Sequence, residues 1–226
     1  MSASGRAADE SSLSEALAGI VLCGGRSSRM GVDKAKLRTW NGSSLLEHVV
    51  KSLSTIATPI ILAPGRASFS SNGKLLQAHP HLSVDDTVPG GGPLSGIVAA
   101  LAASPHRLNA VVAVDMPLVS PSVLALLRDL WTGEDAVVPV ADGRMQPLHA
   151  IYSSTALAGL RSALENDCRV LRHALLGIRV REVHEDAWRV ASPDGRFASN
   201  VNRPEDLREV GLSPPLRRHP TGMTRG

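Results

Sequence analysis

The sequence predicts a three-layer α/β fold with a mostly parallel central sheet and helices on both faces. Short apolar runs alternate along the chain with segments of helical length and periodicity. One run, residues 109–117, is so uniformly apolar that it is typical of a central strand buried on both sides. The β-α-β-α order favours parallel strands joined by crossover helices.

The expected elements follow each other in that alternating order. The apolar runs predict strands at residues 17–23, 59–63, 81–86, 109–117, 135–140, 147–153 and 178–185. Helical spacing predicts helices at residues 43–56, 92–104, 120–131, 154–166 and 169–177. Ligands of such folds bind at the carboxyl ends of the strands, so we expect functional loops after Cys23, Ala63, Asp86 and Val114.

The chain has 226 residues, which favours one domain. We expect this domain at residues 15–211, between a disordered tail at 1–14 and a disordered basic tail at 212–226. The first residues lack the basic and apolar regions of a signal peptide, and no apolar run approaches the roughly 18 residues that a membrane span needs. These features predict a cytoplasmic protein without a membrane partner.

Composition argues against other classes of protein. The two cysteines, Cys23 and Cys168, lie far apart and form neither a disulfide framework nor a zinc-binding spacing. Aromatic residues make up only 3% of the chain, so platforms for base stacking are scarce. A net charge of +3 is weak support for a nucleic-acid partner, and we expect none.

The stretch "VLCGGRSSRMGVDKAKL" follows the first strand directly. Gly24 and Gly25 allow backbone N–H groups to approach a ligand, and Arg29 and Lys34 add charge-assisted hydrogen bonds to phosphate oxygens. The Walker pattern is absent, because Gly31 is not followed by lysine, and the dinucleotide spacing G-x-G-x-x-G is absent as well. The loop therefore favours a nucleoside triphosphate bound in another way.

Asp115 ends the most apolar strand, in "AVVAVDMPLV". A carboxylate there points into the ligand crevice, and Mg²⁺ prefers one or two carboxylates together with phosphates and water. The residues alone fit equally well an aspartate of a turn or helix cap before Pro117.

The glycine stretch resembles the signature of the molybdenum cofactor guanylyltransferases, L-A-G-G-x-S-x-R-M-G-x-D-K-x-x-L, with Cys23 in place of the alanine. The segment around Asp115 resembles that family's C-D-M-P, with Val114 in place of the cysteine. The resemblance extends from Leu17 to Leu207. It implies a Rossmann-like nucleotidyltransferase fold and favours the metal role of Asp115.

The resemblance implies a reaction in which GMP passes from GTP to the terminal phosphate of molybdopterin, giving the guanine dinucleotide cofactor and pyrophosphate. Mg²⁺ is the implied cofactor, and the implied partners are GTP, the molybdopterin cofactor, and recipient molybdoenzymes or their chaperones. Arg29, Lys34 and Asp115 are the implied catalytic residues, with Asp115 as the metal ligand. The implied nucleotide contacts are Leu22, Cys23, Gly24, Gly25, Arg29, Lys34, Asp86, Gly91 and Asp115.

The base and acceptor contacts follow from three further motifs. In the resembling family an aspartate in the place of "VDDTVPGGGPLSG" contacts the nucleotide base, and we choose Asp86 over Asp85 for this role. A carboxylate can accept from the N1 and N2 donors of guanine, although the two aspartates also fit a solvated acidic turn. The segment "GRMQPLHAIY" resembles the family's Q-P-L segment beside the acceptor and suggests Gln146, whereas His149 is assigned to packing. The segment "SNVNRPEDL" resembles the family's N-x-N-x-P-x-D-L, and we assign Asn200 and Asn202 to the acceptor substrate, with a place in the Mg²⁺ shell or, for one of them, a helix N-cap as the open alternatives.

Some alternatives stay open at this stage. An asparagine that many family members have after the second strand is replaced by "LAPGR", where only backbone groups or Arg66 can substitute. The chain could also be a cytidylyltransferase for the same pterin, a phospholactate guanylyltransferase, or a nucleotide-sensing module without catalysis.

Overall fold

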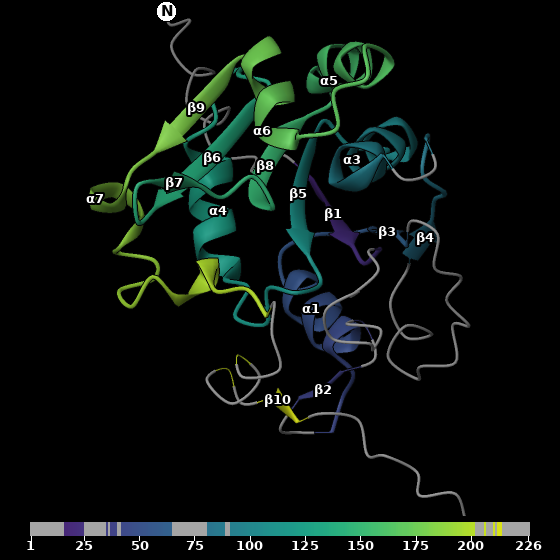
Figure 1. Cartoon of the computed structure of the whole chain (residues 1–226). Coiled ribbons are helices and arrows are strands. Elements are labelled where there is room, and N and C mark those ends of the chain that lie inside the picture. Colours follow the sequence, from purple (N-terminus) through teal and green to yellow (C-terminus); the bar gives the residue numbers. More distant parts are fainter. Residues whose placement is uncertain are drawn as a thin grey trace, which may run out of the picture.

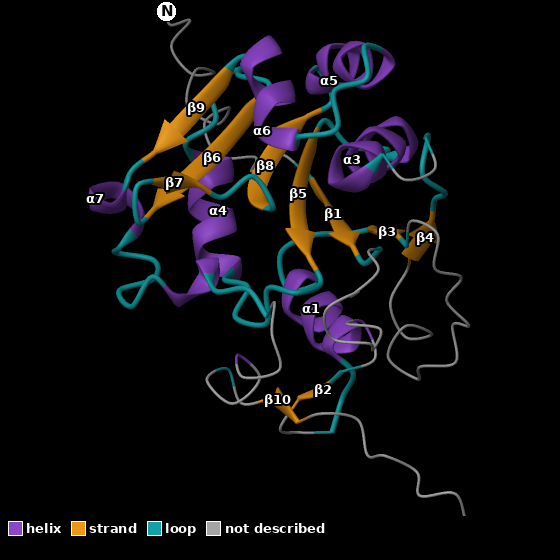
Figure 2. Cartoon of the chain, in the orientation of Figure 1, coloured by secondary structure: helices purple, strands orange, loops and turns teal. Residues whose placement is uncertain are grey.

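A computed structural model of the chain describes residues 16–24, 35, 37–39, 42–64, 81–88, 91–201, 206, 210 and 212–213. Within these residues, a main sheet lies between two layers of helices (Figures 1 and 2). The order of its strands is β4-β3-β1-β5-β8-β6, and both β7 and β9 pair with β6. A short second sheet consists of β2 and β10.

The strands of the main sheet are β1 (Leu17–Leu22), β3 (Ile60–Ala63), β4 (His81–Ser83), β5 (Leu108–Ala113), β6 (Ala136–Ala141), β7 (Arg144–Met145), β8 (His149–Ser153) and β9 (Val180–Val183). The second sheet pairs β2 (Arg38–Thr39) with β10 (Leu212–Ser213). The α-helices are α1 (Leu45–Leu53), α3 (Gly92–Ala103), α4 (Pro121–Asp129), α5 (Ala156–Glu165), α6 (Leu171–Ala174) and α7 (Glu185–Trp188).

The predicted fold class is confirmed, with β7 and β8 reversed relative to the other strands of the main sheet. β1 runs parallel to β3 and β5, β3 runs parallel to β4, and β6 runs parallel to β9. β8 lies between β5 and β6 and is antiparallel to both. The amino end of β8 therefore lies at the edge where the parallel strands have their carboxyl ends.

Alternation along the strands fills a core on each face of the sheet. In β5, Ala110 and Val112 pack in one core with the apolar faces of α1 and α4, whereas Val111 packs in the other core with α3 and α5. All six residues of β5 are buried, as they are in β1. This burial on both faces explains why the central strands have uninterrupted apolar sequences.

Two helices begin at a serine N-cap. Ser44 Oγ accepts from the N–H of Glu47, and the Glu47 carboxylate accepts from the N–H of Ser44, which is a capping box. At α4, Ser120 Oγ accepts from the N–H of Val123, and Pro121 occupies the first turn.

The structure also differs from the predictions at several points. The strand expected at 109–117 ends at Ala113, because the N–H of Met116 turns back to the carbonyl of Ala113. β10 extends regular structure two residues past the expected domain end at 211, because it pairs with β2. The remaining residues of the two expected tails lie outside the described residues.

The β6–β7 hairpin, the short strand β2 and the single-turn helix α7 were not predicted. Asp142 and Gly143 connect β6 to β7 with φ angles of 51° and 68°. This is the conformation for which Asp-Gly is favoured in two-residue hairpin turns, so the dipeptide was an available signal. Among the described residues, no helix is both long and apolar enough to cross a membrane.

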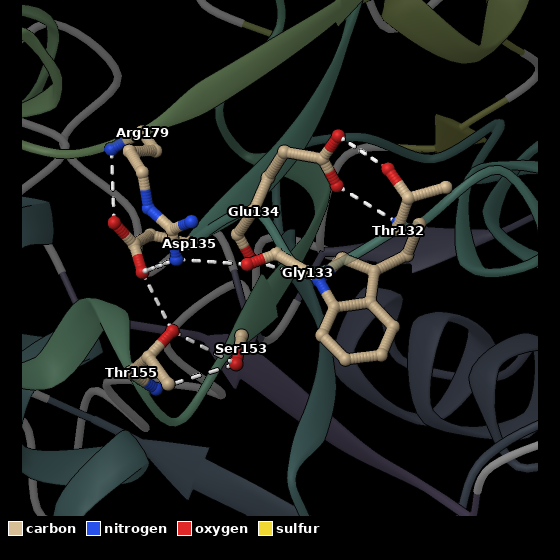
Figure 3. A network of polar contacts seen from close by, with 8 residues as sticks. Thr132, Gly133, Glu134, Asp135, Ser153, Thr155 and Arg179 are labelled. Atoms are coloured by element: carbon tan, nitrogen blue, oxygen red, sulfur yellow. Dashed lines mark hydrogen bonds and ion pairs between the residues drawn. The ribbon is translucent and has the colours of Figure 1, made fainter.

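A polar network links the amino ends of β6 and β9, at the edge of the sheet away from the carboxyl ends of the parallel strands (Figure 3). One carboxylate oxygen of Asp135 accepts from Thr155 Oγ1 at 2.6 Å, and the other accepts from the N–H of Arg179 at 2.9 Å. Partial burial of Asp135 acts to raise its pKa, but the hydrogen bonds from Thr155 and Arg179 outweigh burial and lower the pKa below its ordinary value.

Asp135→Asn should lower the free energy of unfolding by about 1–2 kcal/mol at neutral pH, since hydrogen bonds to a charged group are lost. Because the folded-state pKa is lowered, the carboxylate contributes stability above its ordinary value of 3.8, and this contribution is lost as pH falls through the lowered value. Urea unfolding at neutral pH and below about pH 3 measures both effects. Asp129→Asn, which alters a carboxylate on the exposed side of α4, should change stability by less than about 0.5 kcal/mol at either pH. Equal effects of the two variants would contradict this account.

Candidate active site

The carboxyl ends of β1, β3 and β5 lie side by side at one edge of the main sheet (Figure 1). Leu22 pairs with Ala63 on one side and with Ala113 on the other. Just beyond the strands, the N–H of Cys23 donates to the Ala63 carbonyl at 3.1 Å, and the N–H of Val114 donates to the Leu22 carbonyl at 2.9 Å. The loops expected after Cys23, Ala63 and Val114 therefore begin next to one another.

Solvent exposure changes abruptly along the predicted nucleotide contacts at the end of β1. Leu22 and Cys23 are buried, and Gly24 is exposed. The Cys23 side chain belongs to the apolar core beside Val21, so its thiol fills space there. Only the backbone at Gly24 is open to a ligand within this described segment.

Asp115 lies two residues beyond β5 and is half-buried. Its carbonyl accepts the N–H of Val201 at 2.9 Å, and the turn before it is closed by Met116 and Ala113. The residue predicted to bind the metal is thus fixed through its backbone at the same edge as Gly24. Asn200 is exposed and directly precedes Val201, so this predicted acceptor contact is one residue from the amide that bonds to Asp115.

Asp86 reaches the same edge from β4. A Cβ atom on Gly96 of α3 would lie 3.6 Å from Asp86 Oδ1, 3.1 Å from Leu22 Cδ2 and 3.4 Å from Ala63 Cβ. The Asp86 carboxylate therefore sits above a helix position without a side chain, beside the end of β1. Burial raises the pKa of Asp86, and the neighbouring Asp85 charge raises it further. Asp85 itself is exposed.

The turn between Asp86 and α3 is fixed by a buried serine. Ser95 Oγ accepts from the N–H of Val88 at 2.8 Å and donates to the Val88 carbonyl at 3.1 Å, while the N–H of Gly91 bonds to the same carbonyl. A Cβ on Gly91 would come within 2.7 Å of Ser95 Cβ. Glycine is needed at position 91 for this turn, whatever contact it makes with a nucleotide.

Gln146 lies in a bulge at the start of β8. Ala136 pairs with Tyr152 and Val137 with Ile151, so an unbroken ladder would place Val140 opposite Leu148, but Val140 pairs with Met145 instead. The segment 146–148 is therefore left out of the ladder, as in other bulges that redirect side chains near functional sites.

This bulge is tied to the end of β5 and to the core. The Leu148 carbonyl accepts from the N–H of Ala113 at 3.1 Å, and Tyr152 Oη donates to the Pro147 carbonyl at 3.0 Å. The N–H of Gln146 bonds to Pro139 of β6. The predicted acceptor contact thus lies on a fixed backbone beside the strand that leads to Asp115.

Four predicted site residues, Gly25, Arg29, Lys34 and Asn202, lie outside the described residues, as does Arg66. The other predicted residues lie at or near the carboxyl ends of the strands: Leu22 of β1, Cys23 and Gly24 just after it, Asp86, Gly91, Asp115, Gln146 and Asn200. Sequence reasoning gave no role to His48 and assigned His149 to packing. Both bond to the segment after Asp115, and the only sequence signal was a histidine within the apolar strand of β8.

The donor set suits a magnesium ion shared with a substrate. Within the described ranges, no three His, Cys, Asp or Glu side chains come together as a metal site. The single carboxylate of Asp115 provides the hard oxygen donors that Mg²⁺ prefers, and phosphate oxygens and water commonly supply the other ligands.

Comparison with known families identifies the family of this chain. The profile of the family described as "MobA-like NTP transferase domain" matches residues 19–182, most of the chain. The chain belongs to this family of nucleotidyltransferases. The matched residues begin in β1 and end in β9, so they include every strand that forms the site.

Curated relatives of this MobA-like enzyme carry a more specific name. A "Probable molybdenum cofactor guanylyltransferase" from Chloroflexus aggregans is 33% identical over 202 residues, which cover 86% of this chain and 93% of the relative. A relative of the same name from Pelotomaculum thermopropionicum is 34% identical and covers 84% of this chain and 89% of its own length. The recognised family resemblance is confirmed.

Solved structures agree in fold. The molybdopterin-guanine dinucleotide biosynthesis protein A from Archaeoglobus fulgidus is 26% identical, with a TM-score of 0.71 over 85% of this chain and 96% of that one. A 2-C-methyl-D-erythritol 4-phosphate cytidylyltransferase from Thermus thermophilus has a TM-score of 0.62 at 17% identity, covering 87% of this chain and 97% of that one. The second likeness shows the shared fold alone.

Gly96→Val should weaken nucleotide binding by about 10-fold or more, because its methyl groups would displace the Asp86 carboxylate and the end of β1. Titration of GTP by calorimetry, with circular dichroism as a check on folding, measures the effect. Ala99→Val places the same side chain on a half-buried position of the same helix and should bind GTP like the parent. Unchanged binding by folded Gly96→Val would show that this corner of the site is not used.

Proposed function

We propose that this protein transfers GMP from GTP to the terminal phosphate of the molybdopterin cofactor, releasing pyrophosphate and leaving the guanine dinucleotide form of the cofactor. The names of its curated relatives support this reaction. The observation that carries the proposal is the convergence of Gly24, Asp86 and Asp115 at one edge of the sheet. Gly24 belongs to the stretch that carries the family's glycine signature.

In the proposed reaction, an oxygen of the pterin phosphate attacks the α-phosphorus of GTP in line. A new P–O bond forms, the bond to the β-phosphate oxygen breaks, and pyrophosphate leaves with the electron pair. A phosphate monoester is nucleophilic at neutral pH, so the protein needs no strong base. The barrier comes from repulsion among anions and from the charge that builds on the leaving group.

Cationic side chains offset this repulsion and stabilise the charge on the leaving group. Arg29 holds the departing phosphates and Lys34 stabilises the α-phosphate, roles that rest on the sequence signature. Asp115 holds Mg²⁺, which when bound supplies positive charge that offsets the phosphate repulsion. The half-buried position of Asp115 and its backbone bond to Val201 keep the carboxylate in place before substrates arrive.

Asp86 selects guanine and the β7–β8 bulge faces the acceptor. An ionised carboxylate accepts from both the N1 and N2 donors of guanine, and cytosine offers no such pair. Gln146, Asn200 and Asn202 contact the pterin half of the acceptor. The product then passes to recipient molybdoenzymes or their chaperones.

The experiment that tests the function measures pyrophosphate release with the molybdopterin cofactor, Mg²⁺ and each of GTP, CTP, ATP and UTP in turn. Release with GTP alone supports the proposal. Release with CTP alone would make the enzyme a cytidylyltransferase. Nucleotide binding without release, when phospholactate also fails as acceptor, would indicate the sensing module.

Asp115→Asn should lower turnover by about 10²–10³-fold, since one preorganised group at the developing charge is lost. Metal-free GTP binding should persist, because the glycine loop and Asp86 are unchanged. Steady-state kinetics over a range of Mg²⁺ concentrations measures the loss. Asp186→Asn, an exposed carboxylate of α7, is the matched control and should keep full turnover. Full turnover in Asp115→Asn would show that Asp115 is not a metal ligand in the reaction.

Asp86→Asn should weaken GTP binding by about 10–100-fold, since hydrogen bonds to a charged acceptor are lost. In the parent, GTP affinity should fall as pH drops through the raised pKa of Asp86, because the protonated acid no longer accepts from both donors. Asp85→Asn is the control: it should keep GTP affinity at neutral pH and move this acid limb to lower pH, since it removes the neighbouring charge. If GTP affinity fell at the same pH in the parent and in both variants, another group would be responsible for the titration.

A further inference from the structure

The segment after Asp115 is held by two histidines from different elements. Nε2 of His48, on α1, lies 2.9 Å from the Pro117 carbonyl oxygen. Nε2 of His149, at the start of β8, lies 3.0 Å from the amide nitrogen of Ser120. Together with the bond from Val201 to the Asp115 carbonyl, these contacts fix the segment 115–120 at its beginning, middle and end.

The two imidazoles use the same atom in opposite ways. A backbone amide always donates, so Nε2 of His149 must be without a proton, and a neutral ring then carries its proton on Nδ1. The partner of His48 is a carbonyl, so Nε2 of His48 must donate. The contact of His149 therefore needs a neutral ring with its proton on Nδ1, whereas the contact of His48 needs only a proton on Nε2.

The surroundings of His149 keep it neutral. The residue is fully buried, and this burial lowers its pKa to about 3. Its ring packs against Phe197 at a centroid distance of 4.7 Å, and Phe197 in turn meets the edge of Trp188 at 4.9 Å. An acceptor nitrogen is thus present at Ser120 throughout the physiological pH range.

Packing alone does not explain a histidine here. Nδ1 of His149 is buried and has no hydrogen-bond partner among the described residues, which makes the ring costly to bury. An apolar side chain would avoid this cost, but it would leave the Ser120 amide, at the cap of α4, without its acceptor. The position therefore trades stability for a fixed point on this segment.

We propose that His149 is a positioning residue for Asp115, acting by accepting the Ser120 N–H through Nε2 and so fixing the course of the segment that presents the Asp115 carboxylate. His48 is the second anchor of that segment. The inference rests on the proposed function only for the claim that the positioned carboxylate serves the reaction.

The first test compares two substitutions of His149. In His149→Gln, the amide oxygen of glutamine lies where Nε2 was and can accept from Ser120, whereas His149→Leu has no acceptor. We expect His149→Leu to raise the apparent KM for Mg²⁺ by about 10–100-fold, as loss of a residue that orients a metal ligand does, and His149→Gln to stay within about 3-fold of the parent. Leu160→Ala, in the core on the other face, controls for lost stability. A KM for Mg²⁺ that rises as much in Leu160→Ala as in His149→Leu would overturn the proposal.

The second test needs no activity. Nitrogen NMR of the histidine ring should show protonated Nδ1 and unprotonated Nε2 in His149 from about pH 5 to about pH 8. Amide hydrogen exchange at Ser120 and at Asp115 should accelerate at least 10-fold in His149→Leu and stay near the parent rate in His149→Gln. A proton on Nε2, or unchanged exchange in His149→Leu, would overturn the positioning role. Absence of pyrophosphate release by the parent would instead reject the proposed function and leave this result standing.

Discussion

The parallel pairing of β1 with β5 is the constraint on which the rest of the candidate site depends. It runs through six residues and ends with Leu22 opposite Ala113. Because both strands point the same way, the residues that follow them, Gly24 and Asp115, leave the sheet together although they are far apart in sequence. The intervening crossovers place α1 against one face of the sheet and α3 against the other.

Burial shifts the pKa values of two ionisable groups near the site in opposite directions. It raises the pKa of Asp86 and lowers that of His149, because a low-dielectric environment disfavours charge of either sign. For His149 the neutral form is the useful one, as an acceptor for Ser120. For Asp86 the charged form is the proposed one, and the residue is only partly buried.

Local sequence pattern predicted what depends on local physics. The uniform apolar run of β5 and the start of α4 at Ser120 can both be recognised in the sequence, and Asp115 lies between them. The pairing of β10 with β2 and the bulge at Gln146 were not predictable, because each depends on which distant strand becomes the neighbour. The role of His149 was hidden for the same reason: its partner, Ser120, is 29 positions away in sequence.

The reversed direction of β8 has a consequence for how such enzymes diversify. The residues proposed to contact the nucleotide are dispersed over β1, β4 and β5 and the loops after them, whereas one proposed acceptor contact, Gln146, belongs to a single hairpin, from β6 through the bulge to β8. Insertions or exchanges within that hairpin would alter the proposed surroundings of Gln146, while the strands that lead to the proposed nucleotide contacts would keep their spacing. That part of the acceptor side can therefore change through a single contiguous genetic event, whereas a change of nucleotide requires concerted substitutions in separate parts of the chain.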